Sequence, residues 1–396
     1  MRCLSTRSPN GPYVSLVEAI SRGLAPDGGL WVPERVPKSR DVLKPYFEGE
    51  PLDPAELARA AFTFPAPIRW LDETTGLLEL FHGPTAAFKD FGARFLAECL
   101  ARLGVTSTIL VATSGDTGAA VGSAFAGRSG FRVVILYPDG RVSPRQAHQL
   151  GAFGENVRAF RVAGTFDDCQ RMVKEALAQR PDTTSANSIS LGRLLPQLTY
   201  YASSALEVER AGKGPANFVV PTGNLGNALA CVLARDMGLP IGKIVLATNA
   251  NRVLSELVKT GVYKPAKTVA TIANAMDVGD PSNLERLRFW HPDISKVVSA
   301  DSVSDAAIRE AVKRAFEVHG VAVDPHTACG LEVRWRQRAE GTWLVAATAH
   351  PAKFESIVEP LIGQRVEPPA ALAALLARPS VAQPLEATTE ALLRRL

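Results

Sequence analysis

Residues 107–126 read STILVATSGDTGAAVGSAFA. The apolar and β-branched residues of Ser107–Thr113 predict a buried strand, and the small apolar residues of Ala119–Ala126 predict a helix. The turn between them, Ser114–Gly118, is short and contains two glycines. A strand, a short turn and a helix form one βα unit. Repeated units of this kind build parallel sheets covered by helices.

The same alternation continues through most of the chain. Further strands are predicted at Val133–Tyr137, Val157–Val162, Phe218–Val220, Ile244–Thr248 and Trp343–Thr348. Helices are predicted at Phe88–Leu103, after the capping pattern Thr165–Asp168, and at Leu194–Arg210, Ala228–Met237 and Asp305–His319. The fold class is therefore α/β, with two largely parallel sheets whose strands lie on either side of residue 190.

Three parts can be distinguished along the 396 residues, which are many for a single core. Residues 1–75 are rich in Pro and Gly and predict an irregular N-terminal region. Residues 76–360 form the expected core, with a smaller α/β domain nested at about residues 100–185. Residues 361–396 are expected to form a C-terminal helical tail.

The composition excludes several classes of protein. A net charge of +4, from 44 basic and 40 acidic side chains, is too small to indicate nucleic-acid binding. The chain has no apolar signal region and no run of 18 apolar residues, so no membrane association is expected. Five scattered cysteines favour a reducing compartment, the cytoplasm. The six histidines lack the spacing of zinc ligands, and no metal site is expected.

A lysine between two phenylalanines is the strongest chemical signal. Residues 81–92 read FHGPTAAFKDFG and place Lys89 at the start of a helix. Apolar surroundings disfavour the charged amine, so the pKa of Lys89 should fall, and the neutral amine is a nucleophile towards aldehydes. Lys353 is the one serious alternative, but its neighbour Glu355 favours a charged, paired role.

A glycine-containing loop, Thr222–Asn227 (TGNLGN), follows a predicted strand and opens a helix. Backbone N–H groups in such a loop can approach a phosphate, and the helix dipole adds attraction. A turn without a ligand is about equally compatible with this segment taken alone. The loop lacks the Lys-Ser/Thr of a P-loop, so it does not identify the ligand.

Three other segments carry polar groups near strand ends. The hydroxyls and N–H groups of Ser114–Gly118 suit a carboxylate, although helix capping is the commoner use of such residues. Asn187–Arg193 offers an amide, hydroxyls and a guanidinium, which suit a phosphate ester, although a solvated arginine is the commoner case. Thr348 ends the last predicted strand. His326 and His350 are interpreted as structural histidines.

Together these segments resemble the threonine synthases of the longer, bacterial and fungal type. The resemblance extends to Ser5–Arg7, Gly23–Leu30 and Asn274–Asn283 and covers nearly the whole chain. This family belongs to the pyridoxal phosphate (PLP) enzymes of fold type II, related to the tryptophan synthase β subunit. The resemblance implies that O-phospho-L-homoserine and water are converted to L-threonine and phosphate by γ-elimination and β-addition, the last step of threonine biosynthesis.

The resemblance also implies a role for thirteen positions. Lys89 would attach the cofactor covalently and act as the general base. The cofactor phosphate would be held by Gly223, Asn224, Leu225 and Asn227, while Thr348 would contact the nitrogen of the cofactor ring and Asp116 would lie beside the ring. The carboxylate side of the substrate would be received by Ser114, Gly115 and Thr117, and the substrate phosphate by Asn187, Ser188 and Arg193.

The sequence departs from the family pattern in three places. Residues 1–75 are shorter than usual, Ser190-Leu191 replaces the more usual Asn-Trp, and Ala86 stands where Leu is common. Two alternatives therefore stay open: a phospholyase that releases a 2-oxo acid, and a catalytically silent homologue. A β-eliminating dehydratase is less favoured, because it needs no second phosphate site. We expect a monomer or a homodimer.

Overall fold

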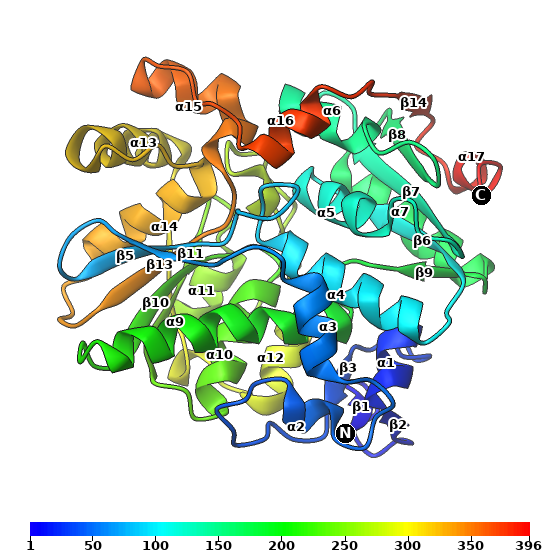
Figure 1. Cartoon of the computed structure of the whole chain (residues 1–396), viewed down its shortest axis with the longest axis horizontal. Helices are drawn as coiled ribbons and strands as arrows, with labels where there is room; N and C mark the ends of the chain where they lie inside the picture. The colour runs from blue at the N-terminus through cyan, green and yellow to red at the C-terminus, as the bar shows by residue number, and fades with distance from the viewer.

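The computed structural model describes residues 1–396, which form two main sheets covered by helices and a small N-terminal sheet (Figure 1). The larger sheet has the strand order β12-β11-β10-β13-β5-β4. Its strands are β4 (Ile68–Trp70), β5 (Thr75–Glu79), β10 (Ala216–Pro221), β11 (Ile241–Thr248), β12 (Ser299–Ser302) and β13 (Trp343–Ala347). All neighbours pair in parallel except β4 and β5, which are antiparallel at one edge.

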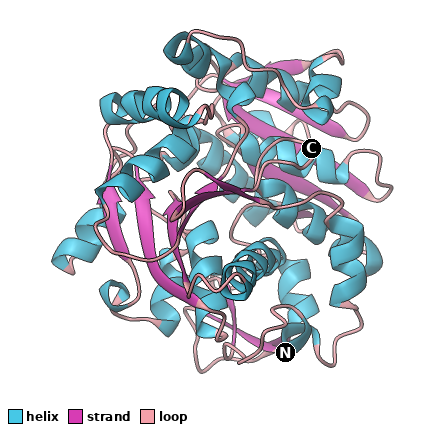
Figure 2. Ribbon diagram, turned by 60° about the vertical axis from the view of Figure 1, so that its left-hand side comes forward, coloured by secondary structure: helices cyan, strands magenta, loops and turns pink.

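The smaller sheet has the order β14-β8-β7-β6-β9, and every pair in it is parallel. Its strands are β6 (Ser107–Ala112), β7 (Phe131–Pro138), β8 (Val157–Val162), β9 (Thr183–Ser185) and β14 (Ala382–Leu385). Figure 2 shows the strands of the two sheets as separate groups, each with helices packed around it. The predicted α/β class with two largely parallel sheets is confirmed. The expected division of their strands at residue 190 is wrong in part, because β4 and β5 belong to the larger sheet and β14 to the smaller one.

The helices alternate with these strands. Those of the first half are α1 (Leu16–Arg22), α2 (Lys44–Phe47), α3 (Pro54–Ala61), α4 (Lys89–Arg102), α5 (Asp116–Phe125), α6 (Pro144–Gly151), α7 (Phe166–Gln179), α8 (Leu191–Leu194) and α9 (Leu198–Arg210). Those of the second half are α10 (Gly226–Asp236), α11 (Val253–Thr260), α12 (Leu284–Trp290), α13 (Asp305–His319), α14 (Pro325–Arg336), α15 (Glu355–Ile362), α16 (Ala370–Leu376) and α17 (Thr389–Leu393). Four 3-10 turns are η1 (Leu195–Gln197), η2 (Asn274–Met276), η3 (Ile294–Lys296) and η4 (Pro351–Phe354).

Local sequence explains several of these boundaries. The Thr165 side chain accepts a hydrogen bond from the N–H of Asp168, and the Asp168 side chain accepts one in return, so α7 begins with a full capping box. The helix predicted over Leu194–Arg210 is divided instead into α8, η1 and α9, because Pro196 lies within it and cannot donate a backbone hydrogen bond. Helix α10 is buried from Gly226 to Ala234, as expected for a helix packed between other elements.

The two terminal parts of the chain hold more strand than the sequence suggests. The N-terminal region contains an antiparallel sheet, β2-β1-β3, made of β1 (Arg2–Ser5), β2 (Val14–Ser15) and β3 (Trp31–Pro33). The C-terminal tail is not purely helical, because β14 joins the smaller sheet next to β8. Strands of two to four residues are too short to give a clear alternating pattern. None of the helices is long and apolar enough to cross a lipid bilayer.

Candidate active site

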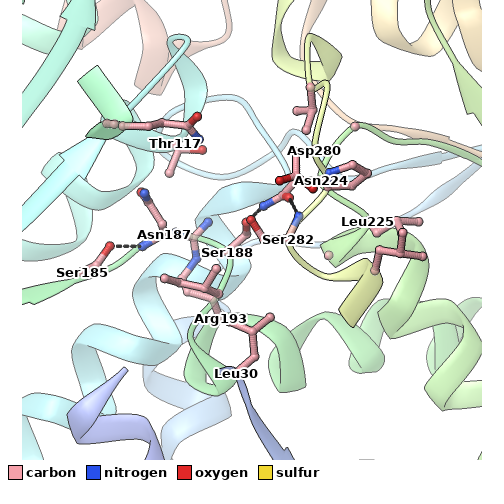
Figure 3. A pocket seen from close by; sticks show the side chains of 18 of the residues that line it. Leu30, Thr117, Ser185, Asn187, Ser188, Arg193, Asn224, Leu225, Asp280 and Ser282 are labelled. Atoms are coloured by element: carbon pink, nitrogen blue, oxygen red, sulfur yellow. Dashed lines mark hydrogen bonds between the residues drawn. The ribbon is translucent and has the colours of Figure 1, made fainter. Parts of the chain in front are cut away.

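One large pocket, of about 1360 Å³, lies between the two sheets. Parallel strands of an α/β fold carry ligands at their carboxyl ends, and segments that follow β6, β9, β10 and β13 form much of the wall. Twelve of the thirteen predicted site residues line this pocket; Gly115 does not. Figure 3 shows how Thr117, Asn187, Ser188, Arg193 and Asn224 approach one another from different elements.

Lys89 is the first residue of α4 and lines the pocket. The preceding segment is tied to the end of β13, because Phe88 donates its N–H to the carbonyl of Thr348 (2.9 Å) and His350 donates to that of Ala86 (3.0 Å). The Lys89 ammonium lies 5.8 Å from the centre of the Phe88 ring. Burial lowers the pKa of Lys89 to about 8, against an opposing effect of Asp116.

The loop between β10 and α10 presents a row of free donors. None of the backbone N–H groups from Gly223 to Asn227 donates a hydrogen bond within the chain. Leu225 has φ +63° and turns the chain into α10, which directs these groups towards the start of that helix. A Cβ atom on Gly223 would lie 2.8 Å from the Cα of Met276, so only glycine fits there. This arrangement suits a phosphate group.

Asn227 adds a side-chain donor to this row. Its Oδ1 accepts hydrogen bonds from the hydroxyls of Tyr200 (2.6 Å) and Tyr201 (2.9 Å), which fixes the orientation of the amide. The Nδ2 group is buried and has no partner in the chain. A buried donor without a partner is unfavourable by about 1–3 kcal/mol, and an anionic ligand would remove that penalty.

The side chain of Asn224 joins three segments of the wall (Figure 3). Its Nδ2 donates to Ser188 Oγ (2.7 Å), and its Oδ1 accepts from the N–H of Ser282 (2.6 Å). Asn283 donates in turn to the carbonyls of Ser188 and Asn224. The Asn224 side chain therefore holds the wall together, and its backbone N–H is the group left for a ligand.

Three further polar atoms without partners lie in the segment after β9. They are Asn187 Oδ1, Ser190 Oγ and Arg193 Nε, although Arg193 also donates through Nη1 to the carbonyl of Ala186. Burial lowers the pKa of Arg193 to about 10, so the guanidinium remains charged at neutral pH. Gly92 of α4 leaves room for it, since a Cβ there would lie 2.9 Å from Arg193 Nε. Arg193 is thus a buried cation facing the pocket.

Lys353 has a different partner from the one that its sequence position suggests. Its ammonium is fully buried and forms an ion pair with Asp116 (2.7 Å), while Glu355 lies near Arg145 instead. Burial alone would raise the pKa of Asp116, but the charges of Lys353 and Lys89 outweigh burial and hold that pKa below its usual value. Lys353 is consequently bound in a pair, and it does not line the pocket.

Sequence reasoning gave no role to the segment from η2 to Ser282, which forms part of the wall. His326 supports this segment: its Nε2 accepts from the N–H of Ala275 (3.1 Å), so its Nδ1 carries the proton and donates to Asp324 (2.6 Å). His326 was interpreted as structural, and these contacts agree, although it also lines the pocket. Burial raises the pKa of Asp277, in the same segment, to about 6.

Comparisons with known proteins agree with this geometry. Residues 72–342 match the family model described as pyridoxal-phosphate dependent enzyme. Residues 2–56 and 327–395 match the models for the threonine synthase N terminus and the threonine synthase C-terminal region. The threonine synthase of Serratia marcescens is 37% identical over 95% of this chain and 94% of its own length.

Solved structures extend the likeness to three dimensions. The crystal structure of threonine synthase from Escherichia coli has a TM-score of 0.93 and 34% identity, covering 100% of this chain and 99% of its own. The PLP-bound threonine synthase from Brucella melitensis has a TM-score of 0.90 and 32% identity, covering 100% of this chain and 98% of its own.

Fold and pocket thus define a PLP-dependent enzyme of fold type II. Within that class the chain belongs to the threonine synthase family, whose models and relatives match it from end to end. The residues present fit the cofactor: the loop of free N–H groups and the unpartnered Asn227 amide suit its phosphate, and the amine of Lys89 suits its aldehyde.

Proposed function

We propose that this enzyme converts O-phospho-L-homoserine and water to L-threonine and inorganic phosphate. In the overall reaction the phosphate leaves from the γ carbon, and the hydroxyl derived from water is added at the β carbon. We further propose that the enzyme works in the cytoplasm, a reducing compartment in which its five buried, unpaired cysteines would remain thiols.

The cofactor phosphate is assigned to the N-terminus of α10. The backbone N–H groups of Gly223, Asn224 and Leu225 and the side-chain amide of Asn227 would hold it, and the macrodipole of α10 adds attraction. Thr348, at the end of β13, would donate its hydroxyl to the ring nitrogen. When bound, PLP supplies an aldehyde for covalent attachment and a ring that withdraws electrons from the substrate carbons.

Lys89 is assigned the covalent attachment and the proton transfers. Because its pKa lies near 8, a useful fraction of the amine is neutral at physiological pH. When it is not linked to the cofactor, Lys89 Nζ would act as a base that removes a proton from the α carbon of the substrate and then one from the β carbon. Its place at the start of α4, held by the contacts of Phe88 and Ala86, keeps the amine within the pocket.

The substrate is assigned to the opposite side of the pocket. Ser114, Gly115 and Thr117, in the turn before and the first residues of α5, would receive the carboxylate side. Asn187, Ser188 and Arg193 would receive the substrate phosphate, for which the buried guanidinium is the strongest attraction.

The observation that carries this proposal is the presence of two separate anion-binding groups in one pocket. One is the α10 N-terminus, and the other is the Asn187–Arg193 segment, where the buried guanidinium of Arg193 has an unpartnered Nε donor. A PLP enzyme acting on a substrate without phosphate needs only the first. The second group therefore favours a phosphorylated substrate over a simple hydroxy amino acid.

Product analysis tests the reaction. Incubation with O-phospho-L-homoserine should give threonine and phosphate in equal amounts, and 2-oxobutyrate as the main product would instead identify a phospholyase. Arg193→Lys keeps the charge but loses the planar fork, so it should weaken substrate binding more than cofactor binding. If Arg193→Lys leaves KM for the phosphorylated substrate unchanged, the substrate-phosphate assignment is wrong.

Borohydride reduction tests the lysine. Reduction of the yellow protein followed by peptide mapping should place the cofactor on Lys89, and labelling of Lys353 would refute the assignment. A purified protein that stays colourless after addition of PLP would favour the catalytically silent homologue. Lys89→Arg serves as the matched variant, because it keeps a cation at the site but cannot form the covalent link.

A further inference from the structure

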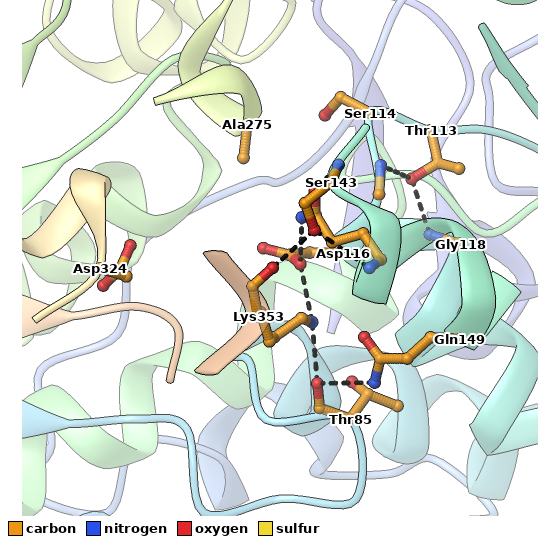
Figure 4. A network of polar contacts seen from close by, with 12 residues as sticks. Thr85, Thr113, Ser114, Asp116, Gly118, Ser143, Gln149, Ala275, Asp324 and Lys353 are labelled. Atoms are coloured by element: carbon orange, nitrogen blue, oxygen red, sulfur yellow. Dashed lines mark hydrogen bonds and ion pairs between the residues drawn. The ribbon is translucent and has the colours of Figure 1, made fainter. Parts of the chain in front are cut away.

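Lys353 connects the C-terminal part of the chain to the start of α5, through a buried ion pair, and to the turn before Lys89, through a hydrogen bond. Lys353, in η4, is fully buried, and its ammonium lies 2.7 Å from Asp116 Oδ1 at the start of α5. The same ammonium donates to the carbonyl of Thr85 (2.8 Å), and Gln146 donates to Asp116 Oδ1 (2.9 Å). Figure 4 shows this network of contacts around Lys353. Buried charges in proteins require complementary partners of this kind.

The hydrogen bond from Lys353 to the Thr85 carbonyl is made to the turn that precedes Lys89. Thr85 donates both its N–H (2.8 Å) and its hydroxyl (2.7 Å) to the carboxylate of Asp90, so these contacts bracket Lys89 on both sides. Between them, Ala86 has φ +57°, an unfavourable backbone conformation for a residue with a Cβ. Such a conformation persists only where surrounding contacts impose it. Lys353 supplies one of those contacts, through the Thr85 carbonyl.

Asp116, the second partner of Lys353, also affects Lys89, because it is one of the charged groups around that amine. The charged groups that face Lys89 are Asp116 of α5, Arg193 of α8 and Lys353 of η4. Asp116 in turn faces Lys353, Lys89 and His326. Asp116 is therefore the anion that could hold Lys89 as a protonated ammonium. Its carboxylate is instead bound to Lys353 and Gln146.

We propose that Lys353 is a positioning residue, which occupies the Asp116 carboxylate and fixes the Thr85 carbonyl, so that the Lys89 amine stays free of an ion pair and accessible. This role also accounts for a carboxylate beside a pocket that binds anions: Asp116 is neutralised by a buried ammonium, not by the ligand. The inference rests on the assignment of Lys89 under the proposed function.

The test measures the amine of Lys89 in the cofactor-free protein. Acetylation by a small anhydride is followed over pH 6–10, and the Lys89 peptide is quantified by mass spectrometry. In Lys353→Met, Asp116 loses its partner and captures Lys89, so the midpoint of Lys89 labelling should rise by about one pH unit or more. At pH 8 this corresponds to labelling that is slower by about fivefold or more. The double variant Lys353→Met/Asp116→Asn removes both charges and should return the midpoint towards that of wild type.

Two outcomes overturn the proposal: a Lys353→Met midpoint equal to that of wild type, or a double variant that labels as slowly as the single one. If Lys353→Met does not fold, Asp116→Asn alone provides the test. Removal of the anion should lower the Lys89 midpoint below the wild-type value, and an unchanged midpoint would contradict the inference. Because labelling uses no PLP, it is independent of the borohydride mapping, so failure of the lysine assignment and failure of this role can be distinguished.

Discussion

Asn227→Asp is the substitution that examines the cofactor-phosphate assignment most directly. The new carboxylate keeps one oxygen for the hydroxyls of Tyr200 and Tyr201, which now bind Asn227 Oδ1 at 2.6 and 2.9 Å. The unpartnered Nδ2 donor is replaced by an acceptor. The local fold is therefore retained, while the one side-chain donor offered to the phosphate is lost.

The size of the effect follows from the number of bonds lost. One hydrogen bond to a charged group contributes about 1.5–3 kcal/mol, which corresponds to a roughly 10- to 150-fold weaker Kd for PLP. Repulsion between the carboxylate and the phosphate adds to this loss. The assay is equilibrium titration of the cofactor-free protein with PLP and, in parallel, with pyridoxal, which has the same aldehyde but no phosphate.

The prediction is tested by comparing the affinity of the variant for PLP with its affinity for pyridoxal. PLP affinity should fall by at least about tenfold, since a single charged hydrogen bond is lost, whereas pyridoxal affinity should stay unchanged. Tyr201→Phe serves as a control that leaves the pocket intact and removes one of the two hydroxyls that orient the amide, so its effect on PLP should be smaller. An equal loss of affinity for PLP and pyridoxal in Asn227→Asp would refute the reasoning, because it would indicate general damage to the pocket.

Three other predictions concern the same pocket. Gly223→Ala places a Cβ about 2.8 Å from the Met276 backbone, so it should lower both thermal stability and PLP affinity, measured by thermal unfolding and by titration. Leu225→Gly relieves the left-handed conformation at φ +63° by about 1 kcal/mol but removes a fully buried core side chain, at a cost of about 2–5 kcal/mol, so it should lower the free energy of unfolding of the cofactor-free protein, measured in urea. Lys89 should destabilise the cofactor-free fold below its pKa of about 8, and this penalty should disappear as pH rises towards the unfolded value of about 10.4. The gain in melting temperature of Lys89→Met over wild type should accordingly shrink between pH 7 and pH 10; a constant difference would contradict the lowered pKa.

Much of the fold could be predicted from the sequence because its signals are local. The strand over Val157–Val162 and the helix over Asp305–His319 have the bounds that were predicted, since each is marked by its own periodicity and capping residues. Strands β4, β5, β9, β12 and β14 were not predicted. They are three to five residues long, and most of them pair with strands far away in the chain.

For the candidate site, too, local features could be predicted from the sequence and long-range contacts could not. Residues that come directly after a strand, such as Ser114 and Gly223, could be named because strand ends and glycine turns are visible in the sequence. The partner of Lys353 could not, because Asp116 lies far from it along the chain and meets it only in the folded protein. The orientation of Asn227 likewise depends on Tyr200 and Tyr201, whose hydroxyls carry no sequence signal of that role.

Strand β13 has a consequence for how the protein is made. It lies between β5 and β10, so β5 has only the short edge strand β4 as a partner until β13 is present. On a translating ribosome, β13 emerges roughly 270 residues after β5, a delay of roughly 13 to 54 seconds at 5–20 residues per second. During this interval the apolar face of a nascent hairpin stays exposed. We therefore expect the nascent chain to associate with holding chaperones, and to be released only once its last quarter has been synthesised.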